Sequence, residues 1–165
     1  MVVERSKVAT ICGAVGEAGA NYVLVGGQAV LLWGGGRPTR DIDLLIEPTR
    51  ENARKVLGAL ESLSFRAARD LDPADVAARH VTMITDPFWR VDLMTVAWAI
   101  HYRDVRPRAA VFLVDGARIP TASVPDLIAS KRSDRRQDAL DIEVLEEILR
   151  RQRAGIYPPV VELPG

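Results

Sequence analysis

The first residues with chemical potential are two aspartates, Asp41 and Asp43, at the start of an apolar run in the stretch GGGRPTRDIDLLIE, residues 34–47. Side chains two positions apart in a β-strand point to the same face, so these carboxylates are expected to point together, away from Ile42 and Leu44. Carboxylates held this close repel each other unless a cation lies between them. Such oxygen ligands suit Mg²⁺, which binds one or two carboxylates together with substrate phosphates and water.

A third aspartate, Asp92, lies inside the apolar stretch WRVDLMT, residues 89–95, where a carboxylate serves no packing purpose. An adjacent strand would place Asp92 beside Asp41 and Asp43. Three carboxylates can hold two metal ions, and a two-metal site supports in-line phosphoryl or nucleotidyl transfer. The structural alternative is that Asp41 caps a turn and Asp43 pairs with an arginine of the preceding loop, because short acidic motifs are common by chance.

A glycine pair, Gly26-Gly27, follows an apolar strand at 22–25 and precedes a short helix at 28–33. Glycine lets the backbone approach a ligand closely, and a helix N-terminus presents unpaired N–H groups to an anion. The pair could therefore hold a phosphate, or it could form only a turn. Thirteen residues separate Gly27 from Asp41, which leaves room for one short helix and a return loop. The two motifs would then lie at the ends of neighbouring strands.

This combined pattern resembles the DNA polymerase β-like nucleotidyltransferase superfamily: a hydrophobic strand, Gly-Gly, a helix, Asp-hydrophobic-Asp and a later aspartate on an apolar strand. The stretch VGGQAVLLWGGGRPTRDIDLLIE, residues 25–47, looks most like the small bacterial nucleotidyltransferases, which include the AbiEii-type toxins. It is also similar to aminoglycoside and lincosamide nucleotidyltransferases. The resemblance covers residues 22–63 well and the C-terminal helices more loosely. It implies the nucleotidyltransferase fold.

Position by position, the resemblance implies that Gly26 and Gly27 hold the nucleotide triphosphate. Asp41 and Asp43 would bind catalytic Mg²⁺ or Mn²⁺ ions, and Asp92 would complete the metal site and help to activate the acceptor hydroxyl. Many members carry serine after the first glycine and contact phosphate through its hydroxyl. Gly27 offers only its backbone N–H.

Basic and hydroxyl residues precede the acidic pair: Arg37, Thr39 and Arg40 lie in the loop just before Asp41. Arginine can bind phosphate oxygens in a bidentate way. Arg37 and Thr39 look like the Arg-x-Thr that precedes Asp-x-Asp in the toxin-like relatives, which implies a contact with the triphosphate, most strongly for Arg37. The alternative is a solvated loop with surface charge.

A second charged segment surrounds Lys131, which is the only lysine in the second half of the chain. Asp138 and Asp141 follow it, three residues apart and therefore on one helical face. The segment looks like the closing region of the toxin-type nucleotidyltransferases, where the lysine contacts the triphosphate and an aspartate supports the site. The alternative is a salt-bridged surface helix, which is what most charge runs form.

The elements needed to position these residues follow from periodicity and turn signals. Strands are expected at 22–25, 41–47, 80–85, 89–95, 111–114 and 118–120, and helices at 4–19, 49–63, 73–79 and 125–153, the last broken near Ser133. This predicts an α/β (α+β) protein with a mixed twisted sheet flanked by helices. We expect a nucleotidyltransferase core at 1–121, a C-terminal helical segment at 122–154 packed on it, and a Pro-rich tail at 155–165, in one compact domain. Residues expected in the core include Cys12, Trp33, Trp98, Leu140, Val144, Leu145 and Ile148.

Composition limits the partners and the cellular location to be expected. The 165 residues contain 22 Lys+Arg and 22 Asp+Glu, so no overall charge favours nucleic acid or a membrane surface. Cys12 is the only cysteine, which excludes an internal disulfide. No apolar run approaches the roughly 20 residues of a transmembrane helix, and the N-terminus lacks the apolar core of a signal peptide. A cytoplasmic protein without a membrane partner is expected.

The hypothesis is a metal-dependent nucleotidyltransferase that moves a nucleoside monophosphate from an NTP, such as ATP, to an acceptor hydroxyl. Similarity to the toxin-type relatives makes RNA, especially a tRNA 3′ end, the first acceptor to consider, and a cognate antitoxin protein the expected partner. An antibiotic hydroxyl or a protein is the alternative acceptor. The alternative from another class is a non-catalytic nucleotide- or partner-binding module, such as the antitoxin of a pair.

Overall fold

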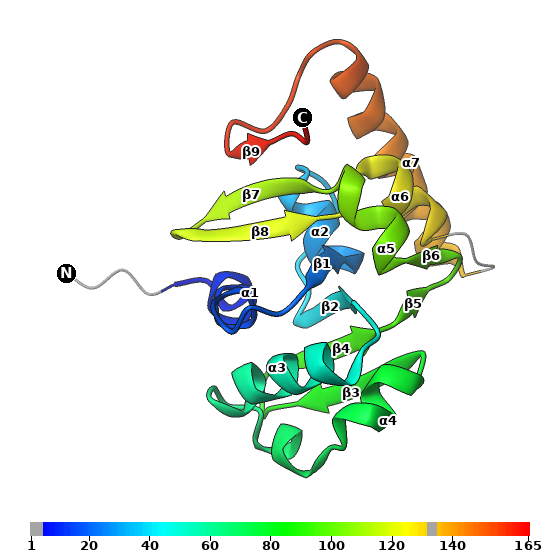
Figure 1. Ribbon diagram of the computed structural model, residues 1–165. Helices are drawn as coiled ribbons and strands as arrows, with labels where there is room; N and C mark the ends of the chain where they lie inside the picture. The colour runs from blue at the N-terminus through cyan, green and yellow to red at the C-terminus, as the bar shows by residue number, and fades with distance from the viewer. Residues whose placement is uncertain (1–4, 132–134) are drawn as a thin grey trace.

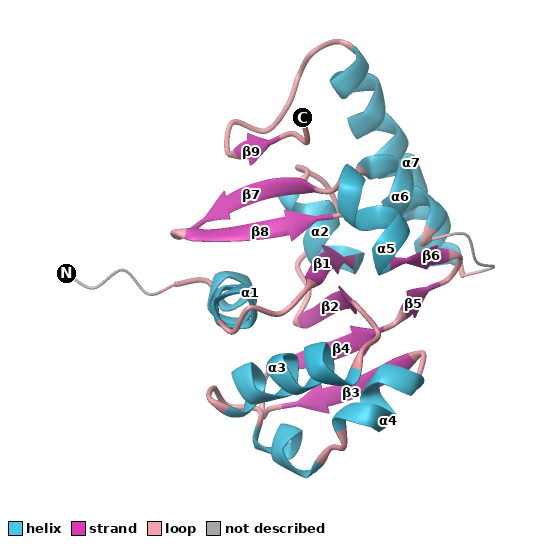
Figure 2. Ribbon diagram, in the orientation of Figure 1, coloured by secondary structure: helices cyan, strands magenta, loops and turns pink. Residues whose placement is uncertain are grey.

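A computed structural model describes residues 5–131 and 135–165 of the chain. Within these residues the centre is a seven-stranded mixed sheet with the strand order β3-β4-β2-β1-β8-β7-β9 (Figure 2). The expected α/β class with a mixed sheet is therefore confirmed. The sheet contains β1 (Tyr22–Val25), β2 (Asp41–Ile46), β3 (Val81–Thr85), β4 (Arg90–Met94), β7 (Ala110–Val114), β8 (Ala117–Thr121) and β9 (Val161–Glu162), and a separate ribbon contains β5 (Val96–Ala97) and β6 (Ile100–His101).

Helices surround the sheet (Figure 1). α1 packs against β8 and α3, α2 packs against β1 and β2, and α6 contacts both α2 and α7. None of the helices within residues 5–131 and 135–165 combines the length and the apolar character needed to cross a lipid bilayer. The helices are α1 (Lys7–Glu17), α2 (Gly26–Leu32), α3 (Arg50–Glu61), α4 (Pro73–Ala78), α5 (Tyr102–Val105), α6 (Val124–Ala129) and α7 (Arg136–Arg153), with short 3-10 helices η1 (Arg66–Asp70) and η2 (Arg106–Arg108).

The register of the sheet decides which residues meet at its centre. β2 runs parallel to β4, with Asp43 opposite Asp92 and Asp41 opposite Arg90. On its other side β2 pairs antiparallel with β1, where Val25 lies opposite Asp43. The end of β1, the beginning of β2 and the middle of β4 therefore meet at one place.

The helix α2 begins two residues earlier than the sequence pattern predicts. It starts at Gly26 rather than Gln28, so no separate Gly-Gly turn precedes it. Gly26 has a φ of +71°, a left-handed backbone angle that residues with a side chain adopt at a cost of about 1–2 kcal/mol. Glycine at this position therefore lets β1 pass directly into α2.

The buried face of α7 differs in part from the one that the sequence predicts. The predicted break near Ser133 lies outside the described residues. α7 buries Leu145 and Ile148 as predicted, but Leu140 is 45% exposed, so its prediction as a core residue is wrong. The buried stripe begins at Asp138 instead, and Leu140 lies about 200° around the helix from that residue.

The C-terminal segment contains a strand that its Pro-rich composition did not predict. β9 pairs antiparallel with β7, with Val161 opposite Phe112. Arg118 of β8 donates two hydrogen bonds to the carboxylate of Glu162, at 3.0 and 2.6 Å. The tail therefore docks along the outer side of β7, where Figure 1 shows the C-terminus.

Two tryptophans expected in the core have opposite surroundings. Trp33 is buried, as predicted; its indole N–H donates to the carbonyl of Ala122 at 2.9 Å. Trp98 is 60% exposed, so the prediction of a core position is wrong. It lies in the turn between β5 and β6, outside the main sheet. Cys12 is fully buried as expected, and burial raises the pKa of its thiol to about 12.

Candidate active site

Three aspartates from neighbouring strands, the acidic triad of Asp41, Asp43 and Asp92, form the centre of the candidate site. Asp92 is buried, whereas Asp41 and Asp43 are partly buried. The carboxyl groups of Asp43 and Asp92 lie within hydrogen-bonding reach of each other. Parallel pairing of β2 with β4 thus brings together acids that are remote in the sequence.

The crowding of these acids changes their protonation. Burial, then the charge of Asp92, then that of Asp41 raise the pKa of Asp43 from 3.8 to about 7, and Lys131 partly opposes this rise. Burial also raises the pKa of Asp92, while the positive charge of Arg90 lowers it. Without a metal ion beside it, the Asp43–Asp92 pair therefore retains a proton close to neutral pH.

Arg90, which sequence analysis did not single out, places a positive charge within the acidic triad. Its Nη2 atom lies 3.3 Å from Asp41 Oδ2, and its Nε atom lies 3.2 Å from Asp92 Oδ1. The second contact is an ion pair but not a hydrogen bond. Both of its atoms are buried, and neither has a hydrogen-bond partner in the described residues. Its position in the sequence is the signal that could have identified Arg90 as a site residue. Arg90 precedes Asp92 by two residues and so shares its face of β4.

The arrangement is not yet that of a closed metal centre. Among residues 5–131 and 135–165, no three acidic, histidine or cysteine side chains converge as ligands around one point. The triad has the oxygen atoms that a divalent ion needs. The guanidinium of Arg90 already contacts two of its three carboxylates, those of Asp41 and Asp92.

Gly26 is required by the position of Asp43. A Cβ atom built on Gly26 would overlap Asp43 Oδ2 and would lie 2.8 Å from Asp43 Cγ. A Cβ atom on Gly27 would meet Thr39 Cγ2 at 3.2 Å, which is tight but close to an ordinary contact. A side chain at Gly26 would therefore displace the carboxylate, whereas Gly27 tolerates a small group more readily.

A hollow of about 390 Å³ lies over the acidic triad and is called the polar hollow below. Besides the triad and Arg90, its lining contains most of the other predicted site residues: Gly27, Arg37, Thr39, Lys131, Asp138 and Asp141. Arg40 is not part of that lining, and its side chain is exposed. Its backbone carbonyl accepts a hydrogen bond from the N–H of Arg90 at 3.1 Å.

Two polar contacts hold the loop that leads into β2. The side-chain amide of Gln28 donates to the carbonyl of Thr39 at 2.9 Å, and Thr39 Oγ1 accepts from the N–H of Asp41 at 3.1 Å. Thr39 therefore fixes the beginning of β2. Gln28 was missed by sequence reasoning, although a single polar residue at the start of the apolar run QAVLLW, residues 28–33, is a usable signal.

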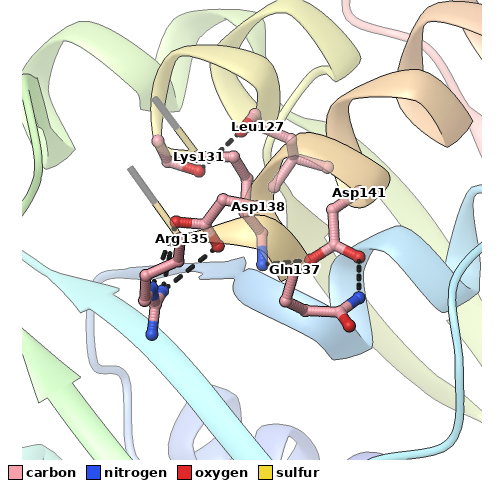
Figure 3. A network of polar contacts seen from close by, with 7 residues as sticks. Leu127, Lys131, Arg135, Gln137, Asp138 and Asp141 are labelled. Atoms are coloured by element: carbon pink, nitrogen blue, oxygen red, sulfur yellow. Dashed lines mark hydrogen bonds and ion pairs between the residues drawn. The ribbon is translucent and has the colours of Figure 1, made fainter. Parts of the chain in front are cut away.

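Lys131 and Asp141 also line the polar hollow, and Figure 3 shows them in one network of polar contacts. Lys131 Nζ lies 3.0 Å from Asp141 Oδ2, with the two side chains 15% and 14% exposed. Gln137 donates to the other oxygen of Asp141 at 2.8 Å. Asp138 is ion-paired with Arg135 at 3.2 Å. These contacts fix Lys131 against α7, and the roles of Gln137 and Arg135 were not predicted from the sequence.

Comparison with known proteins gives a family but no close relative. No curated protein sequence is significantly similar to the chain. Among solved structures, the crystal structure of the lincosamide antibiotic adenylyltransferase LnuA with lincomycin bound has a TM-score of 0.49 and 15% sequence identity, covering 77% of this chain and 86% of that one. The model of the family described as nucleotidyl transferase AbiEii toxin, type IV toxin–antitoxin system, matches residues 14–147. Because that match spans most of the sequence and contains the whole acidic triad, the chain belongs to the AbiEii family of nucleotidyltransferases.

Proposed function

We propose that this nucleotidyltransferase moves a nucleoside monophosphate from an NTP to a hydroxyl at the 3′ end of an RNA, with tRNA as the first candidate, and that it is the toxin of a toxin–antitoxin pair. The pairing of Asp43 with Asp92 across β2 and β4 is the observation that carries the chemistry. The family description, a toxin of a type IV system, supports the toxin role and a cognate antitoxin protein as partner.

Mg²⁺, or Mn²⁺ in its place, is the metal proposed for the acidic triad. Carboxylate oxygens are the ligands that Mg²⁺ prefers. Asp92 Oδ1 is buried and accepts no hydrogen bond in the described residues. Burial, then the charges of Asp92 and Asp41, raise the pKa of Asp43, and a bound cation would oppose that rise. A bound divalent ion would neutralise phosphate charge and stabilise the charge that develops during transfer.

In the proposed reaction, the oxygen of the acceptor hydroxyl forms a bond to the α-phosphorus of the NTP. The bond between that phosphorus and the oxygen bridging to the β-phosphorus breaks, and pyrophosphate leaves. Asp92, in its ionised state, accepts the proton of the attacking hydroxyl. Asp41 and Asp43 would hold the divalent ion, and that ion would bind the reacting phosphate, so that catalysis consists mainly of positioning and charge neutralisation.

The triphosphate is assigned to the polar hollow. Lys131 and Arg37 line it and supply positive charge for phosphate oxygens. Gly27 and Thr39 line the side next to β2, where the absence of a side chain on Gly27 leaves its backbone accessible.

Asp138 and Asp141 are assigned positioning roles. Asp141 holds Lys131 Nζ at 3.0 Å, and Asp138 holds Arg135 at 3.2 Å. Each carboxylate therefore orients a cation near the triphosphate. Arg40 is left without a phosphate contact in this proposal, because its side chain does not line the polar hollow.

The test is transfer of label from α-labelled NTPs in the presence of Mg²⁺, with four acceptors compared: tRNA, a single-stranded oligoribonucleotide, an aminoglycoside and a cell protein extract. The expected result is label at the RNA 3′ end with release of pyrophosphate. Label on the antibiotic alone, or on protein alone, would show that RNA is not the acceptor but would leave the proposed transfer reaction standing. No transfer with any acceptor, together with no Mg-NTP binding by calorimetry, would contradict the proposal.

Lys131→Gln is expected to raise the KM for the NTP about 10- to 100-fold, because a hydrogen bond from a charged donor to phosphate is replaced by a weaker neutral one. Steady-state kinetics with a saturating acceptor measures the change. Lys55→Gln is the matched control, since Lys55 forms a surface ion pair with Glu51 on α3 and does not line the polar hollow. An unchanged KM with a lowered melting temperature would assign Lys131 a purely structural role.

Arg90→Gln is expected to lower the melting temperature of the metal-free protein and to tighten Mn²⁺ binding about 3- to 10-fold. The guanidinium now partly neutralises Asp41 and Asp92, so its removal leaves more negative charge for the ion. Calorimetry with Mn²⁺ and no nucleotide measures the affinity. Arg118→Gln, which removes an exposed pair with Glu162, is the control. Weaker Mn²⁺ binding in Arg90→Gln would show that Arg90 supports the ion rather than competes with it.

A further inference from the structure

A second hollow, of about 260 Å³, adjoins the polar hollow and is called the Trp98 hollow below. The two share Asp43, Met94, Lys131 and Arg135. The remaining walls differ in character, because the Trp98 hollow is lined largely by apolar side chains from β3 and from the β5–β6 ribbon: Val81, Val96, Ala97 and Trp98. A polar space and an apolar space therefore meet at the acidic triad.

Trp98 is held in an unusual way for an apolar residue. It is 60% exposed and has a φ of +54°, a backbone region that a bulky residue rarely adopts. Neither burial nor backbone preference explains a tryptophan here. Residues kept in sparsely populated conformations cluster at ligand-binding positions, and an exposed aromatic face beside a hollow is suited to stacking.

The geometry of phosphoryl transfer indicates what enters the Trp98 hollow. The attacking oxygen and the leaving oxygen lie roughly in line on opposite sides of the phosphorus. With the triphosphate in the polar hollow, pyrophosphate leaves on that side of the triad. The acceptor hydroxyl must then approach the phosphorus from a different direction. The Trp98 hollow adjoins the polar hollow and opens beside Asp43, so it offers such an approach.

We propose that the Trp98 hollow binds the nucleobase of the acceptor's 3′-terminal nucleotide, which stacks on the indole of Trp98. The inference rests on the proposed RNA acceptor. A planar base fits an exposed aromatic ring without sequence preference. The phosphodiester attached to that nucleotide meets the positive charge of Lys131 at the rim shared by the two hollows.

The first test compares Trp98→Ala, Trp98→Phe and Phe88→Ala. Phe88 is 70% exposed in the turn between β3 and β4 and lines neither hollow, so it is the matched control. Trp98→Ala is expected to raise the KM for an RNA acceptor about 5- to 100-fold with the KM for the NTP unchanged. Trp98→Phe keeps most of the affinity, and Phe88→Ala resembles the wild type. A rise in the KM for the NTP instead would place the NTP base in the hollow and overturn the proposal.

The second test replaces the base rather than the ring. An oligoribonucleotide whose 3′-terminal nucleotide is abasic should bind the wild type as weakly as Trp98→Ala binds the normal oligomer, and the two changes together should add no further loss. Fluorescence anisotropy of a 5′-labelled oligomer measures this without catalysis. If no RNA is extended, the proposed acceptor fails but these affinities still decide the stacking. Equal affinities of wild type and Trp98→Ala for the normal oligomer, or no binding by either protein, would overturn the stacking proposal.

Discussion

Asp43→Asn is expected to reduce nucleotidyl transfer on the order of 10³-fold or more and, in the absence of metal, to make the folded protein more stable above pH 7. The loss of activity follows because asparagine keeps the shape of the side chain but removes the charge that would bind the ion. The gain in stability follows because the same charge is unfavourable in its buried position and next to Asp92 and Asp41. One substitution therefore separates the effect of the Asp43 carboxylate on transfer activity from its effect on the stability of the folded protein.

The pH dependence has a definite sign. In the folded protein the pKa of Asp43 is about 7, against an ordinary value of 3.8. Between these values the folded state holds a proton that the unfolded state has lost, so stability is greatest below pH 4 for this group and falls as the pH rises towards 7. For a partly buried carboxylate the total loss is on the order of 2 kcal/mol. The asparagine side chain of the variant does not titrate and escapes this loss.

Urea unfolding in EDTA at pH 5 and at pH 8 measures the effect. The wild type should lose stability between these two pH values, and Asp43→Asn should lose clearly less. Asp72→Asn is the matched control, because Asp72 caps α4 away from the polar hollow and asparagine is an equally good cap. It should keep full activity. Parallel pH profiles for wild type and Asp43→Asn would mean that Asp43 is ionised in the folded protein at pH 5.

The parts of the site that follow from local backbone geometry could be predicted from the sequence. Alternation in a strand places Asp41 and Asp43 on one face and buries Ile42 and Leu44, whatever the rest of the fold does. The boundaries of β1, β2 and β4 follow from short apolar runs between turn residues. The Asp115-Gly116 turn between β7 and β8 also follows from local geometry, because both residues have positive φ values, 47° and 82°, as a two-residue type I′ hairpin turn requires.

The parts that depend on tertiary register could not be predicted. Arg90 contacts Asp41 only because β4 pairs in parallel with β2 at this register, and a shift by one residue would turn it to the other face. Trp98 lies in an apolar run, yet the chain leaves the sheet there to form a separate ribbon. The strand β9 exists because β7 offers a free edge, which the sequence of the tail does not reveal.

Gly26→Ala is expected to lower the free energy of unfolding by about 2–4 kcal/mol and to reduce transfer more than about 100-fold. Two effects add. The backbone of Gly26 has a φ of +71°, which strains any residue with a side chain. The new methyl group would also overlap Asp43 Oδ2, so the carboxylate must move out of the acidic triad.

Gly19→Ala separates these two effects. Gly19 has nearly the same backbone angle, with a φ of +74°, but nothing lies within 4 Å of the Cβ atom that alanine would add. This control should lose about 1 kcal/mol from backbone strain and keep full activity. The excess loss in Gly26→Ala then measures the overlap with Asp43.

A double-mutant cycle with Asp43→Ala tests whether that overlap is the cause. Truncating Asp43 removes the overlapping Oδ2 and the Cγ atom at 2.8 Å and leaves only its Cβ atom at 3.0 Å, so the loss caused by Gly26→Ala should shrink towards the loss that Gly19→Ala causes in the wild type. Chemical denaturation of the four proteins at pH 5, where Asp43 is neutral, keeps charge out of the comparison. Additive losses would mean that α2 moves as a unit to admit the methyl group. The close approach of the first glycine to the second aspartate would then no longer explain why this chain carries glycine at the junction of β1 and α2.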